Sequence, residues 1–101
     1  MAEENYKVVN NENQLQFEIE LDGEKAFLSY RFYKGDIALM HTKVPEAFAG
    51  KGMASALAKE AFNYAEKSKK LVIVYCPFVA KFLENHREYE KFLDPEYRGR
   101  N

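Results

Sequence analysis

His41 and Cys76 are the residues of this 101-residue chain best suited to chemistry near neutral pH. His41 lies late in a predicted strand, and histidine can act as a general base at such pH values. Cys76 ends a later apolar strand directly before a predicted helix start, where a thiol can be activated as a nucleophile or an acid. Each also has an ordinary structural interpretation, as a hydrogen-bonded core histidine and a small buried apolar residue. The sequence leaves open whether the two side chains lie close together.

A glycine-containing loop precedes the longest predicted helix. Gly50 and Gly52 flank Lys51, and apolar residues recur at helical spacing from Met53 onward. The free N–H groups and the dipole of a helix start favour an anion, and glycines let a phosphate reach the backbone amides. The pattern therefore predicts an anion site at residues 50–54, while a tight loop without a ligand stays an alternative.

Antiparallel strands are predicted in the first third of the chain. Residues 6–9 form a short candidate strand, residues 10–13 a polar turn, and residues 14–21 a half-exposed strand with strict alternation. Asp22-Gly23 predicts a type I′ hairpin turn, followed by a return strand over residues 24–34. The predicted inward-facing residues are Leu15, Phe17, Ile19 and Leu21 in the outgoing strand and Ala26, Leu28, Tyr30 and Phe32 in the return strand.

A β-loop-α-β unit is predicted over residues 37–76. Residues 37–44 are predicted as a central strand that ends at Pro45, and residues 71–76 form an apolar run typical of a buried parallel strand. Both strands then end on the same edge of the sheet, beside the glycine loop, where open α/β sheets bind ligands. Pro77 suits the first position of a following helix.

The composition indicates one domain over residues 1–101 with a core from about residue 6 to 93. A net charge of −1 does not favour electrostatic binding of nucleic acid. No stretch is long enough to span a membrane, and the N-terminus lacks the apolar region of a signal peptide. A single cysteine excludes an internal disulfide, and His86 lacks a metal-ligand companion at useful spacing. We therefore expect a cytoplasmic chain without nucleic-acid, membrane or metal partners.

Four short motifs follow one another between about residue 14 and residue 93. They are His-Thr-Lys-Val-Pro at 41–45, Gly-Lys-Gly-Met-Ala at 50–54, Cys-Pro-Phe-Val at 76–79 and His-Arg-Glu-Tyr at 86–89. Their order and spacing resemble the minimal, single-domain group of the GNAT superfamily of N-acetyltransferases. The loop motif of larger GNAT enzymes, Gln/Arg-x-x-Gly-x-Gly/Ala, matches at Gly52 and Ala54 but lacks the leading Gln or Arg here.

The resemblance implies an α/β fold with a mixed, mainly antiparallel sheet and one βαβ unit. It also implies acetyl transfer from acetyl-coenzyme A to an amine, with His41 as base and Cys76 as acid or nucleophile. Larger enzymes often use a tyrosine as acid in the helix where this chain has Phe78 and Phe82. The expected coenzyme-binding residues are Val44, Gly50, Lys51, Gly52, Met53, Ala54 and Lys81. A coenzyme A sensor without catalysis and a protein-interaction module are the alternatives.

In larger GNAT enzymes, two helices lie between the first two strands and enclose the acceptor site. Here residues 10–13 separate the candidate strands, so no helix fits between them. The resemblance therefore implies an open acceptor side, which suits a lysine of a protein or peptide better than a small metabolite. A second subunit in a dimer is an alternative way to enclose the acceptor site. The sequence leaves the oligomeric state open.

Overall fold

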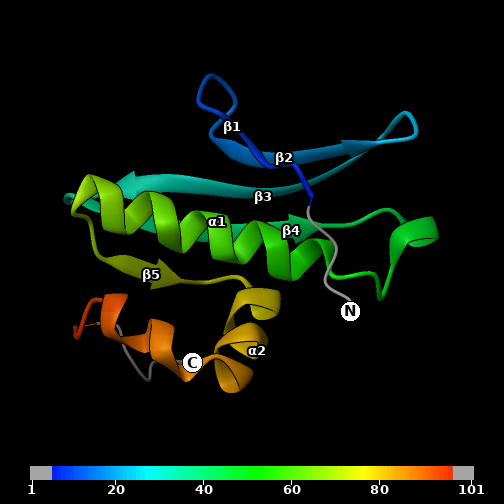
Figure 1. The fold of residues 1–101 in the computed structure, drawn as a ribbon. Coiled ribbons are helices and arrows are strands. Elements are labelled where there is room, and N and C mark those ends of the chain that lie inside the picture. The colour runs from blue at the N-terminus through cyan, green and yellow to red at the C-terminus, as the bar shows by residue number, and fades with distance from the viewer. Residues whose placement is uncertain (1–5, 97–101) are drawn as a thin grey trace.

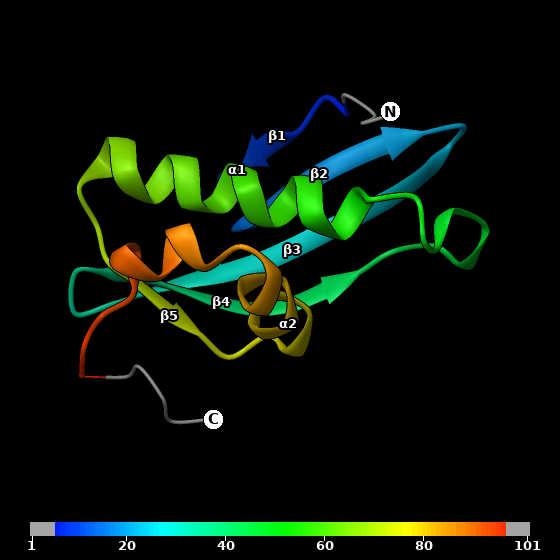
Figure 2. The same ribbon diagram turned by 60° about the horizontal axis from the view of Figure 1, so that its bottom comes forward.

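A five-stranded sheet with the spatial order β1-β2-β3-β4-β5 forms the body of the protein in the computed structural model, which describes residues 6–96 (Figure 1). The strands are β1 (Val9–Asn11), β2 (Gln16–Leu21), β3 (Glu24–Tyr33), β4 (Asp36–Lys43) and β5 (Val72–Val74). The helices are α1 (Met53–Ser68) and α2 (Pro77–Asn85), with short 3₁₀ turns η1 (Glu46–Phe48) and η2 (Arg87–Phe92). Helix α1 lies along the sheet, and α2 packs beside β5 (Figure 2).

The first four strands pair in antiparallel fashion, and β4 pairs with β5 in parallel. Positive φ angles of 52° at Asp22 and 78° at Gly23 confirm the predicted type I′ turn between β2 and β3. Pro77 occupies the start of α2, as predicted, since its missing N–H has no helical acceptor there. This mixed, mainly antiparallel sheet with one βαβ unit confirms the predicted fold class.

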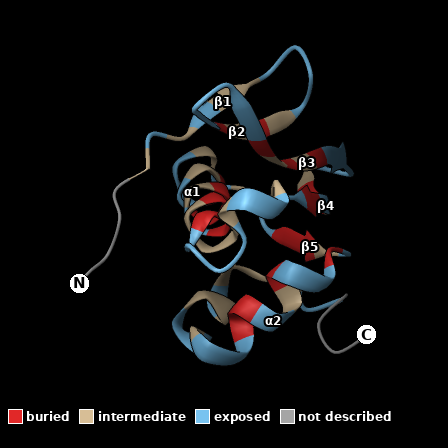
Figure 3. Cartoon of the chain, turned by 90° about the vertical axis from the view of Figure 1, so that its right-hand side faces the viewer, coloured by how far each residue is buried: buried red, intermediate tan, exposed pale blue. Residues whose placement is uncertain are grey.

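One apolar core joins the sheet to both helices. Figure 3 shows buried residues on the strands and on the side of α1 that faces them. Phe17, Leu28 and Tyr30 of the sheet pack with Leu57 and Phe62 of α1, all with at most 1% of their surface exposed. Burying one such side chain contributes roughly 1.5–3 kcal/mol, so this contact surface fixes α1 against the sheet.

The first strand differs from its prediction. It runs from Val9 to Asn11 and includes two asparagines that were predicted to form a turn. Asn10 accepts a 2.7 Å hydrogen bond from the Tyr30 hydroxyl, and Asn11 donates one to the Glu18 carboxylate. These side-chain partners offset the poor strand preference of asparagine. The turn to β2 follows at residues 12–15, and no helix lies between these two strands.

Three predicted core positions near strand ends are exposed instead. Leu15 lies in the turn before β2 with a φ of 56°, Leu21 ends β2, and Phe32 is near the end of β3. Their exposed fractions are 37%, 38% and 47%. The predicted alternation therefore holds in the middle of β2 and β3, where Phe17, Ile19, Ala26, Leu28 and Tyr30 are buried, and fails at the strand ends.

A β-bulge interrupts the pairing of β3 with β4. Tyr30 pairs with Leu39 and Ser29 pairs with His41, so Met40 is the extra residue. A bulge reverses which faces the following residues occupy, because side chains alternate along a strand. The parallel pairing of β4 with β5 ends nearby, at the pair Leu39–Val74. Beyond this point the chain leaves β5 and enters α2, so the two strands diverge.

Two carboxylates interact where the start of β4 meets the segment after η2. Burial, a hydrogen bond with Asp94 and the negative charges of Asp94 and Glu96 together raise the pKa of Asp36 to about 6, while Lys70 opposes the rise. The hydrogen bond from Asp36 lowers the pKa of Asp94. The pair therefore holds one shared proton in mildly acidic solution.

We expect Asp36→Asn to stabilise the protein at neutral pH. A raised pKa in the folded chain means that protonation stabilises folding, fully below the unfolded value of 3.8 and less as pH rises through about 6. Asparagine keeps a donor toward Asp94 at every pH. Urea unfolding should therefore show the variant about 0.5–1 kcal/mol more stable at neutral pH, a small value because the group is partly exposed. The advantage should vanish near pH 4.

Asp22→Asn is the matched control, because Asp22 is an exposed carboxylate in a turn whose positive φ asparagine also adopts. Its stability difference from the wild type, measured over the same pH range, is the baseline for the Asp36→Asn variant. A pH-independent effect of Asp36→Asn would contradict the shared proton.

Candidate functional site

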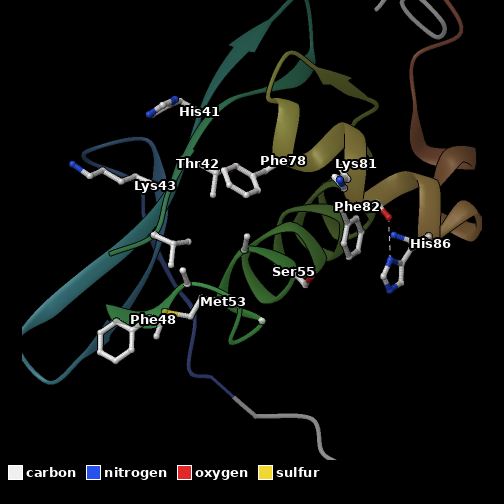
Figure 4. Close-up of a pocket in the computed structure, with 16 residues that line it drawn as sticks. His41, Thr42, Lys43, Phe48, Met53, Ser55, Phe78, Lys81, Phe82 and His86 are labelled. Atoms are coloured by element: carbon white, nitrogen blue, oxygen red, sulfur yellow. Dashed lines mark hydrogen bonds between the residues drawn. The ribbon is translucent and has the colours of Figure 1, made fainter. Parts of the chain in front are cut away.

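A cavity of about 610 Å³ lies where β4 and β5 diverge, between the end of β4, the start of α1 and one side of α2 (Figure 4). The motif at 41–45 contains the end of β4, and the motifs at 50–54 and 76–79 contain the starts of α1 and α2, so the three motifs meet there. The lining residues are His41, Thr42, Lys43, Val44, Phe48, Ala49, Gly50, Gly52, Met53, Ala54, Ser55, Phe78, Lys81, Phe82, Asn85 and His86.

The glycine loop leaves open space beside the backbone amides that precede α1. Gly50 and Gly52 have φ angles of 79° and 83°, which other residues rarely adopt. A Cβ atom added at either glycine would meet no atom within 4 Å, so the space beside these amides is open. The bond from the Ala56 N–H to the Gly52 carbonyl begins the helical ladder, which leaves the preceding N–H groups of α1 without helical acceptors.

The loop is held by bonds to Lys51. The Tyr6 hydroxyl donates a 2.7 Å hydrogen bond to the Lys51 carbonyl, and the Lys51 N–H donates to the Phe48 carbonyl. Lys51 was predicted to meet a phosphate, but it does not belong to the residues that line the cavity. Its backbone fixes the loop, and its exposed side chain lies outside the lining.

Thr42 and Cys76 form a buried polar pair at the strand end of the cavity. The Thr42 Oγ1 atom lies 3.0 Å from the Cys76 Sγ atom, and either group can donate the hydrogen. Thr42 lines the cavity, whereas Cys76 is 1% exposed and lies outside the lining. The hydroxyl therefore connects the thiol with the cavity. Sequence reasoning missed Thr42, although its place opposite Leu28 on β3 marks it as inward-facing once the register is known.

His41 lies on the opposite side of β4 from this pair. It is paired with Ser29, whose hydroxyl donates to the His41 carbonyl, and its ring centroid lies 6.2 Å from that of Phe27. Figure 4 shows its side chain pointing away from Thr42 and Phe78. The bulge at Met40 is the cause, because simple alternation from Leu39 would turn residue 41 inward. The structure thus brings Thr42, and not His41, to Cys76.

One side of α2 forms the remaining wall. Phe78, Lys81, Phe82 and Asn85 recur at helical spacing, and His86 follows at the helix end. Lys81 was predicted to reach the site and lines it. The others were missed, because a sequence pattern shows which residues share a helix face but not which neighbour that face meets.

The cavity lining favours an anionic ligand with an apolar part. Among the described residues that line it, none is acidic, whereas Lys81 of α2 is cationic. Phe48, Met53 and Phe78 add apolar surface. A lysine attracts phosphate as a point charge, and the open amides of the loop add directional donors. The arrangement suits a ligand that carries both phosphate and an apolar arm.

Residues 6–96 include no helix that is both long and apolar enough to cross a membrane. Within the same range, no three His, Cys, Asp or Glu side chains are grouped to hold a metal ion.

A diverging parallel strand pair beside an open helix start places the protein among GNAT-like acyltransferase folds. The family description "GCN5-related N-acetyl-transferase" matches residues 16–93, and the chain belongs to this family. The relatives include protein NATD1 of Danio rerio, 33% identical over 88 residues that cover 82% of this chain and 80% of that protein. Protein NATD1 of Bos taurus is 31% identical over 94 residues that cover 88% of this chain and 83% of that protein.

A solved structure shows the same fold. It is the NMR structure of a GCN5-like protein from Staphylococcus aureus, with a TM-score of 0.68 and 24% identity. The match covers 94% of this chain and 97% of that one. The agreement over nearly the full length of both chains confirms the GNAT-like fold.

Proposed function

We propose that this protein transfers an acetyl group from acetyl-coenzyme A to an amine. The observation that carries the proposal is that one cavity extends from the open glycine loop at the start of α1 to the Thr42–Cys76 pair at the strand end. Acetyl-coenzyme A has phosphates at its centre and a thioester at the end of an apolar arm, which matches these two ends. The coenzyme supplies an activated acetyl carbonyl.

The predicted binding residues other than Lys51 all line the cavity and can each be assigned to a part of this coenzyme. The backbone N–H groups of residues 50–54 would hold the pyrophosphate, because no Cβ occupies the space beside Gly50 and Gly52. Val44 and Met53 would contact the apolar arm, and Lys81 would attract the phosphates of the nucleotide end. The end of β4 beyond its pairing with β5 would lie along the arm.

Acyl transfer to an amine requires a base that takes a proton from the amine and an acid that gives one to the sulfur. His41 would serve as the base for an amine that approaches from the outer face of the sheet, because its ring lies there beside Phe27. The Cys76 thiol would give its proton through the Thr42 hydroxyl, which lines the cavity. The base and the acid then act from opposite sides of β4.

Lysine-containing peptides should be better acceptors than small free amines of similar pKa. The turn at residues 12–15 joins β1 to β2 without helices that would enclose a small substrate. We would incubate the protein with acetyl-coenzyme A and a mixed library of peptides and free amines, and identify the acetylated products by mass spectrometry. A reaction without protein corrects for spontaneous acetylation. A clear preference for one small metabolite by a monomeric protein would contradict the open acceptor side.

A coenzyme A sensor without catalysis is the second candidate. It is favoured by the position of His41, whose side chain points away from Thr42 and Phe78, and by the burial of Cys76 behind Thr42. Binding of coenzyme A without turnover of any amine would support the sensor. Absence of coenzyme A binding would instead support a plain protein-interaction domain.

A further inference from the structure

A column of three aromatic rings ends at the cavity. The ring of Phe62 in α1 is stacked on that of Phe82 in α2, with centroids 6.3 Å apart and 18° between the planes. The ring of Phe82 is in turn stacked on that of His86, at 4.2 Å and 11°. Phe62 and Phe82 are buried, whereas His86 is partly exposed and lines the cavity (Figure 4). His86 is therefore the last ring of the column.

The orientation of the imidazole is fixed before any ligand binds. Its Nδ1 atom lies 3.0 Å from the Phe82 carbonyl oxygen, which can only accept, so Nδ1 carries the hydrogen. Phe82 covers one face of the imidazole. Of the other described rings, Tyr89 lies 6.4 Å away and is tilted by 50°, so it does not stack on the opposite face. A flat ligand ring would find a rigid, partly exposed platform there.

The position of His86 along α2 identifies the ligand ring, provided that the proposed function holds. The apolar arm would end near Thr42 and Phe78, and the pyrophosphate would lie at the start of α1. His86 follows Phe78 by eight residues, or about 12 Å along the helix axis. It thus lies at the other end of the cavity, toward which the nucleotide of the coenzyme would extend.

We propose that the adenine ring of coenzyme A stacks on the imidazole of His86 and extends the Phe62–Phe82–His86 column. A purine has a large flat face, and stacking of a base on an aromatic side chain is strong enough to measure by truncation. Stacking needs the ring of His86 and not its free nitrogen. A phenylalanine at this position should therefore replace it.

Calorimetric titrations of His86→Ala and His86→Phe with coenzyme A and with 4′-phosphopantetheine, which lacks the adenosine, test this. His86→Ala should bind coenzyme A about tenfold more weakly than the wild type. His86→Phe should stay within about threefold of the wild type, because its ring keeps the platform. Binding of 4′-phosphopantetheine should be the same in all proteins. Glu84→Ala, at an exposed residue of α2 outside the lining, is the matched control.

Each other outcome would count against the stacking. Equal coenzyme A affinity in a folded His86→Ala variant would overturn it. A His86→Phe variant as weak as His86→Ala would assign the contact to the imidazole nitrogen. An equal loss for 4′-phosphopantetheine would reveal a general structural effect. If wild-type protein does not bind coenzyme A at all, the proposed function itself fails, and that result differs from failure of the adenine contact alone.

Discussion

Replacing Cys76 with alanine is expected to lower the rate of acetyl transfer by ~10²–10⁴, the usual effect of losing a proton-transfer group. Coenzyme A affinity should stay within about twofold, because Cys76 lies outside the cavity lining. The substitution should also cost about 1–2 kcal/mol of stability, since it leaves a small void and removes the partner of the Thr42 hydroxyl. Turnover and binding are therefore measured on protein shown to be folded at the assay temperature.

Thr42 offers a test of how the thiol would act. Thr42→Val keeps the shape of the side chain but removes the hydroxyl that links Cys76 to the cavity. If the proton passes through this hydroxyl, Thr42→Val should lose rate to a similar extent as Cys76→Ala, and Thr42→Ser should retain most of it. Full activity in both Cys76→Ala and Thr42→Val would show that the pair has only a structural role. His41 or bound water would then carry out the proton transfers.

A nucleophilic role of Cys76 would also require an intermediate in which Cys76 carries the acetyl group. Incubation with acetyl-coenzyme A and no amine should then add the mass of one acetyl group at Cys76, and an acceptor amine should remove it. Loss of rate in Cys76→Ala without such an adduct in the wild type favours the acid role. The burial of Cys76 behind Thr42 leads us to expect no adduct.

Replacing Gly52 with valine is expected to weaken coenzyme A binding at least tenfold, about 1.4 kcal/mol. The added side chain would occupy the open space beside the helix-start amides, where the pyrophosphate is proposed to bind. Valine also disfavours the φ of 83° at this position, so the substitution will lower stability in addition. Titration with coenzyme A measures the affinity, and thermal unfolding measures the stability.

Gly23→Val separates these two effects. Gly23 has a φ of 78° in the β2–β3 turn, and a Cβ atom there also meets open space. Because Gly23 lies outside the cavity lining, its valine variant should show a comparable loss of stability with unchanged coenzyme A affinity. Unchanged affinity in a folded Gly52→Val variant would rule out the loop as the pyrophosphate site.

The sequence by itself determined the features that depend on local chemistry. Asp22-Gly23 specifies a type I′ turn because both residues tolerate positive φ, and Pro77 specifies a helix start because it has no N–H to donate. The apolar run at 71–76 and the helical stripe from Met53 predicted the βαβ unit, because the spacing of apolar residues reflects the local backbone conformation. The four spaced motifs indicated the protein family, and the match over residues 16–93 confirmed that family.

Tertiary structure decided which of the candidate residues meet. The pattern of residue types in β4 does not predict the bulge at Met40. The bulge nevertheless turns His41 outward and Thr42 toward Cys76. The stacking of Phe62 on Phe82 joins the core of α1 to the wall of the cavity, and this contact depends on how α2 docks beside α1. Local patterns fix which residues share a face of one element. The register of the strands and the docking of the helices determine which neighbouring residues that face contacts. Both follow from packing across the whole core.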